Sequence, residues 1–72
     1  MKFTSLIGYA VTKMPSPADI KDARHRAGLT QSQAAALVGV QPRAWRYWEG
    51  GGRKMTAAVW ELFQIKVAAI RR

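Results

Sequence analysis

Few residues in this chain could carry chemistry, and most of them lie in one basic and aromatic stretch. The segment QPRAWRYWEGGG, residues 41–52, contains two Trp, one Tyr and two Arg before three consecutive glycines. The whole chain has no Cys, one His and four acidic residues among its 72. This inventory is too small for a metal cluster or a paired nucleophile and base. We therefore expect no enzyme activity, no metal and no cofactor.

The charge balance points to a polyanionic partner. Twelve Lys and Arg against four acidic residues give a formal net charge of +8. Such an excess attracts DNA or RNA first and anionic membranes second. The apolar runs are too short and interrupted to span a bilayer, and the last segment lacks the basic polar face of a membrane-surface helix. We expect a nucleic-acid partner, no membrane association and a cytoplasmic location.

Capping and stop signals predict four helices in a single all-α domain, residues 1–72. SPAD and TQSQ are typical helix starts, with a capping residue followed three positions later by Asp or Gln. Gly28, Gly39 and the three glycines after Glu49 are typical stops. The predicted helices span about 17–27, 31–38, 42–49 and 56–72, with a flexible basic loop, GGGRKM, before the last. Residues 1–13 fit a strand face or a helix face equally well, since periodicity cannot decide between them.

One segment, GLTQSQAAALVGVQPRAWRYWEGG, resembles the helix-turn-helix of the lambda-repressor and Cro family of phage and bacterial regulators. The likeness covers roughly residues 17–63, and it is carried by Gly28, Leu29, Thr30, Gln31, Ala35, Gly39, Val40, Trp48 and Glu49. Within that family, QPRAWRYWEGG in so short a chain is most similar to the anti-CRISPR-associated repressors of phages. The resemblance implies a compact four- to five-helix domain with the helix-turn-helix at about 30–49. Its second helix would lie in the DNA major groove.

The resemblance implies base-reading roles for the exposed face of that second helix. Gln41, Arg43 and Tyr47 match positions that face base edges, and Arg46 would reach a base or a phosphate. Arg43 is the leading candidate for a base-reading contact, because bidentate Arg–guanine contacts are the commonest specific pairing. Pro42 departs from the family pattern and can offer only apolar contact. The alternatives are a solvated face for the two arginines and a core-covering edge for Tyr47.

A second set of residues is expected to contact DNA phosphates. Gln31 resembles the family's phosphate-contacting glutamine at the start of the first motif helix. Gln33 is either a further phosphate contact or only a capping residue. Arg53 and Lys54, directly after the glycines, would clamp phosphates; the alternative is that they only keep the loop soluble.

Arg24 and Glu49 are expected to form a salt bridge. The resemblance implies it, because an Arg of the first helix bridges to the Glu that closes the recognition helix in this family. Removing one partner of a buried pair would leave a poorly solvated charge and cost about 3 kcal/mol. The expected role is structural and involves no DNA contact.

The last helix, TAAVWELFQIKVAAIRR, is apolar on more sides than one packed face requires. One flank is expected to pack on the core and the other to meet a second subunit. The expected dimer interface consists of Trp60, Phe63, Val67 and Ile70. The alternative is a monomer in which residues 1–13 cover this flank.

These features together predict a sequence-specific repressor that binds double-stranded DNA as a homodimer on an inverted-repeat operator. It would block transcription sterically at the nucleoid of a bacterial host, on its own promoter and that of a small phage or mobile-element operon such as an anti-CRISPR operon. No small-molecule ligand is evident. The alternative is the antitoxin of a toxin–antitoxin pair, which binds both DNA and a partner protein.

Overall fold

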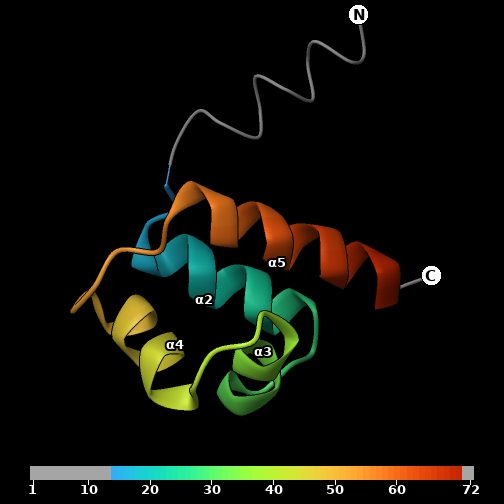
Figure 1. Ribbon diagram of the computed structural model, residues 1–72, viewed down its shortest axis with the longest axis horizontal. Helices are drawn as coiled ribbons and strands as arrows, with labels where there is room; N and C mark the ends of the chain where they lie inside the picture. Colours follow the sequence, from blue (N-terminus) through green and yellow to red (C-terminus); the bar gives the residue numbers. More distant parts are fainter. Residues whose placement is uncertain (1–13, 71–72) are drawn as a thin grey trace, which may run out of the picture.

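The computed structural model describes residues 14–70, which form four α-helices and no strand (Figure 1). The helices are α2 (Pro17–Arg26), α3 (Gln31–Leu37), α4 (Pro42–Gly50) and α5 (Ala57–Ile70). The predicted all-α class is therefore confirmed. The two alternatives for residues 1–13 concern a segment outside the described residues.

Polar side chains begin three of the helices where the sequence predicts. The Asp19 backbone N–H donates to Ser16 Oγ over 3.1 Å, and the Ser16 N–H donates back to Asp19 Oδ2 over 3.1 Å. Thr30 and Gln33 form the same reciprocal pair at 3.1 and 2.9 Å. Thr56 Oγ1 accepts from the N–H of the third residue of α5 over 3.2 Å. Each cap satisfies N–H groups that have no partner inside the helix.

Glycines close the turns on either side of α4. Gly39 has a φ of 75° and makes the turn between α3 and α4, and Gly51 has a φ of 85° after α4. A residue with a Cβ pays a steric cost in this left-handed region. α4 extends one residue beyond the predicted end at Glu49, because Gly50 remains helical and only Gly51 turns left-handed.

The core lies between α5 on one side and α3 with α4 on the other (Figure 1). Its largest fully buried side chains are Trp45, Phe63, Ile20 and Met55. Ala34 and Ala35 are completely buried in α3, and their small side chains let α4 and α5 approach that helix closely. Helices α2, α3, α4 and α5 therefore all contribute to one core.

The packing of α5 shows that part of the predicted dimer interface is wrong. Phe63 is only 1% exposed, and its ring lies 5.0 Å from that of Trp45 between centroids, so it belongs to the core and cannot meet a second subunit. Trp60 and Val67 are half-buried and also pack against the core, whereas Ile70 is exposed. The period of the apolar residues alone could not show which flank of α5 the core covers.

We expect Gly51→Ala to lower the free energy of unfolding by about 1 kcal/mol, because alanine is strained at a φ near 85°. Urea denaturation followed by helical circular dichroism measures this loss. Gly50→Ala is the matched control: a Cβ there would meet nothing within 4 Å, and alanine suits a helix, so stability should hold or rise slightly. Equal stability of both variants would contradict the left-handed turn.

Candidate nucleic-acid interface

One face of α4 is basic and exposed, while the opposite face is buried. Arg43, Arg46 and Tyr47 are exposed, and Tyr47 keeps 47% of its surface open. Trp45 is fully buried, and Trp48 packs against the core edge-on to it with 5.6 Å between the ring centroids. The helical spacing of three and four residues puts the two arginines and the tyrosine on one side. The packing of the tryptophans therefore determines the direction in which Arg43, Arg46 and Tyr47 point.

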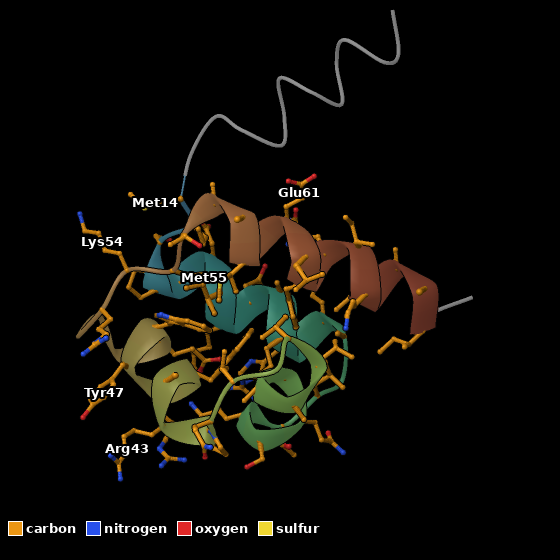
Figure 2. All side chains as sticks on the ribbon, in the orientation of Figure 1. Met14, Arg43, Tyr47, Lys54, Met55 and Glu61 are labelled. Carbon is orange, nitrogen blue, oxygen red and sulfur yellow. The ribbon has the colours of Figure 1, made fainter. Side chains whose placement is uncertain are left out.

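The exposed face of α4 borders a hollow of about 680 Å³ that carries three guanidinium groups. The hollow is lined by Gln41, Pro42, Arg43, Ala44, Arg46, Tyr47 and Arg53. None of these described residues is acidic. Figure 2 shows Arg43 and Tyr47 pointing away from the body of the molecule, at the same end as Lys54. This end is thus a concentrated positive surface.

The loop after α4 is attached to the last turn of that helix. The N–H groups of Gly52 and Arg53 both donate to the Tyr47 carbonyl oxygen, over 2.9 and 3.3 Å. A Cβ on Gly52 would lie 3.3 Å from Tyr47 Cδ1, so the loop backbone passes close against the tyrosine ring. The first residues of the loop are therefore hydrogen-bonded to α4, and Arg53 lines the same hollow as Arg43 and Arg46. The spacing of the sequence did not indicate this attachment.

The predicted ion pair between Arg24 and Glu49 is present as the centre of a larger network. Glu49 Oε2 accepts from Arg24 Nε and from Trp45 Nε1, each over 2.6 Å. Its Oε1 accepts from Arg24 Nη2 and from Gln31 Nε2, each over 3.0 Å. Arg24 Nη1 donates to the Leu29 carbonyl over 3.0 Å. The carboxylate thereby joins α2, α3 and α4 behind the exposed basic face.

Two of the predicted phosphate contacts have structural roles here. One amide N–H of Gln31 is committed to Glu49, which leaves at most one N–H of that side chain for a phosphate. The Gln33 side chain accepts from the Thr30 N–H, which matches the capping alternative. The sequence pattern did not predict Gln31 and Trp45 as partners of Glu49. For Trp45 a signal exists, since it lies four residues before Glu49 on one helix.

The surroundings of Glu49 lower the pKa of its carboxyl group from 4.5 to about 2. Burial raises this pKa, since the Glu49 side chain is only 5% exposed. The hydrogen bonds from Arg24, Trp45 and Gln31, together with the Arg24 charge, lower it by more. The carboxylate is therefore ionised throughout the physiological pH range and holds its donors in place.

The arrangement of α3, the turn at Gly39 and α4 is that of a helix-turn-helix, in which the second helix lies in the major groove of DNA. Residues 18–63 match the family model described as a helix-turn-helix domain, and the chain belongs to this family. Membership of the helix-turn-helix family and the exposed basic face of α4 together indicate that the protein is a DNA-binding regulator. No curated protein matches the chain. None of the helices within residues 14–70 has the length and apolar character needed to cross a membrane.

We expect Glu49→Gln to lower the free energy of unfolding at pH 7 by about 3 kcal/mol. Because the folded-state pKa is depressed, the stabilisation is complete above pH 4.5 and is lost as the pH falls towards 2. The variant should lose this acid dependence as well. Thermal unfolding of both proteins between pH 7 and pH 2 measures the two effects.

Glu61→Gln serves as the control, because no ion pair of Glu61 exists within residues 14–70. It should change stability little at any pH. Equal melting temperatures for Glu49→Gln and the unmodified protein would show that the Glu49 network contributes nothing to stability.

Proposed function

We propose that this protein is a sequence-specific transcriptional repressor that binds an inverted-repeat operator as a homodimer. The observation that carries this proposal is the exposed face of α4. Gln41, Arg43, Arg46 and Tyr47 surround one hollow together with Arg53, and no acidic side chain lines it. A major groove is wide enough to admit such a helix, and its base edges present acceptors to arginine.

Base reading is assigned to the first turns of α4. Gln41 and Arg43 lie at the start of this helix, where helix-turn-helix proteins contact base edges. Arg43 would bind guanine O6 and N7 through its two-pronged guanidinium. Arg46 and Tyr47 lie one turn further on and would contact a base or the adjoining sugar-phosphate. Pro42 carries no hydrogen-bonding side chain, so any preference at its position would come from apolar contact.

Backbone binding is assigned to the loop after α4. Arg53 borders the same hollow as Arg43, and Lys54 is exposed beside it. Because the loop is hydrogen-bonded to Tyr47, these cations stay close to the base-reading face. Phosphate contacts of this kind set the position of a protein on the duplex and make affinity depend on salt. Gln31 and Gln33 would add to these contacts through their remaining amide N–H groups.

Repression would be steric, with a bound dimer covering promoter DNA. Two symmetric copies whose α4 helices are about 34 Å apart would read successive major grooves and need an inverted repeat. Trp60, Val67 and Ile70 remain candidates for the subunit contact, whereas the buried Phe63 does not. The resemblance of the sequence favours a cytoplasmic role in a bacterial host, at a phage or mobile-element operon such as an anti-CRISPR operon.

Selection from a random double-stranded DNA pool at physiological salt tests this function directly. We expect enrichment of an inverted repeat whose half-sites lie about 10 base pairs apart. Retained DNA without an enriched sequence would mean that the positive charge binds phosphate alone. Co-purification with the product of an adjacent gene would then favour the antitoxin alternative.

Arg43→Ala should weaken binding to the selected operator by roughly 10- to 100-fold and relax the base preference at one position of each half-site. Lys54→Ala is the matched control, because it removes the same charge from the phosphate-binding loop. It should weaken binding to all sequences about equally and make the slope of log affinity against log salt shallower by about 1 for each phosphate that is no longer neutralised. Fluorescence anisotropy on operator and single-base variants separates these results. An unchanged preference profile for Arg43→Ala would remove Arg43 from the base-reading set.

A further inference from the structure

A second hollow lies between the start of α2 and the loop after α4, next to the basic face. Its volume is about 640 Å³, which is within the range of small-molecule sites in proteins. Its walls come from two segments of the chain, residues 14–20 and 48–55. Figure 2 shows Met14, Lys54 and Met55 at this corner of the molecule. It is called the α2–α4 hollow below.

Most of the wall of the α2–α4 hollow is apolar. Ile20 and Met55 are fully buried, so they form its floor, whereas Met14 keeps 49% of its surface open at the rim. The half-buried Trp48 adds an indole to the wall. A ligand in this hollow would therefore bury an apolar body against aliphatic carbon, a thioether and an aromatic ring.

The charged groups of the hollow are both cations. Arg53 and Lys54 are exposed and have no ion-pair partner within residues 14–70. None of the described residues that line the hollow is acidic. An anionic group on the ligand would complement these cations, and the two oxygens of a carboxylate match the planar fork of a guanidinium.

Trp48 offers a further hydrogen-bond donor at this hollow. Trp45 donates its indole N–H to Glu49, whereas the Trp48 N–H has no acceptor in the described part of the chain. No buried side-chain nitrogen in that part lacks a partner, so the Trp48 N–H reaches the surface. Its flat indole also favours an aromatic ligand, because aromatic rings pack well against one another.

Arg53 connects the α2–α4 hollow to the proposed DNA-binding face. It lines both hollows, beside Arg43 and Tyr47 in one and beside Trp48 in the other. Its backbone N–H is bonded to the Tyr47 carbonyl over 3.3 Å, so its side chain can turn between the two while the backbone stays in place. A guanidinium bonded to a carboxylate has fewer donors left for a phosphate. The two sites are therefore coupled, and each ligand lowers the affinity for the other.

We propose that the α2–α4 hollow binds a small aromatic carboxylate and that this ligand releases the protein from DNA. The aromatic body packs against Trp48 and Met14, and the carboxylate binds Arg53 and Lys54. This inference rests on the proposed function, because it assigns a regulatory ligand to the same repressor. Release follows because the ligand occupies two cations that would otherwise bind phosphates.

Naphthaleneacetate is the probe for this site, and its neutral amide, naphthaleneacetamide, is the matched control compound. In an NMR titration of the full chain without DNA, the acid should shift the indole N–H signal of Trp48, which the variant Trp48→Phe assigns. The signal of Trp60, which does not line this hollow, should move much less. The amide should bind at least about tenfold more weakly, because it cannot pair with the two cations. Equal binding of both compounds, or a larger shift of Trp60 than of Trp48, would overturn the proposal.

Two exposed apolar residues provide a matched pair of variants. Met14→Ala removes apolar surface from the hollow and should weaken naphthaleneacetate binding by roughly threefold to tenfold. Ile65→Ala removes apolar surface from α5, outside the hollow, and should leave that binding unchanged. Neither residue belongs to the proposed DNA-binding set, so without the compound both variants should bind the selected operator like the unmodified protein. Equal affinity of the two variants for naphthaleneacetate would overturn the assignment of this hollow.

Release from DNA is measured by fluorescence anisotropy on the selected operator, with and without saturating naphthaleneacetate. We expect the compound to lower operator affinity by roughly tenfold. It should also make the slope of log affinity against log salt shallower by about 2, because two phosphate contacts are lost. Naphthaleneacetamide should change neither quantity. A compound that binds at Trp48 and leaves both quantities unchanged would overturn the regulatory role.

The ligand site and the DNA-binding function fail in distinguishable ways. The NMR titration contains no DNA, so it tests the ligand site even if no DNA sequence is enriched. An enriched operator together with an unmoved Trp48 signal would overturn the ligand site and leave the DNA-binding function standing.

Discussion

The arrangement of this domain depends on one buried carboxylate. Glu49 accepts hydrogen bonds from Arg24 of α2, Gln31 of α3 and Trp45 of α4, so three helices share a single anionic centre. A buried charge is costly unless its lone pairs are satisfied, and here both oxygens accept two bonds each. A packing that buried Glu49 without these donors would leave its charge unpaired. The network thus favours this one arrangement of α2, α3 and α4 in a chain too small to rely on core volume alone.

The hydrogen bonds to the buried Glu49 carboxylate determine the direction in which the basic face of α4 points. α4 has only nine residues, and a helix of this length is marginal in water by itself. The tryptophan at its middle is buried and donates to Glu49, and this contact defines the rotation of α4 about its axis. Arg43 and Arg46 therefore point outward because Trp45 points inward. The loop cations follow, since their backbone is bonded to the Tyr47 carbonyl. The same buried network would thus position both the residues proposed to read bases and the residues proposed to bind phosphates.

The two sides of α5 explain why so small a chain carries so much apolar surface. Phe63 completes the aromatic core with Trp45, while Leu62 and Ile65 remain on the outside. A helix with apolar residues on opposite sides must be covered twice or leave one side in water. Helix α5 lies on the far side of the molecule from α4 (Figure 1).

The sequence alone determined the helices, their starts and their stops, because capping side chains and left-handed glycines act over three or four residues. It also indicated the exposed arginines and the Arg24–Glu49 pair through the family pattern. Only the tertiary structure decided which flank of α5 is buried, that Gln31 turns towards Glu49, and that the glycine loop is bonded to α4. These outcomes depend on contacts between residues distant in the chain, for example Phe63 with Trp45. Local spacing is the same whichever of two apolar flanks the core covers, so periodicity could not distinguish them.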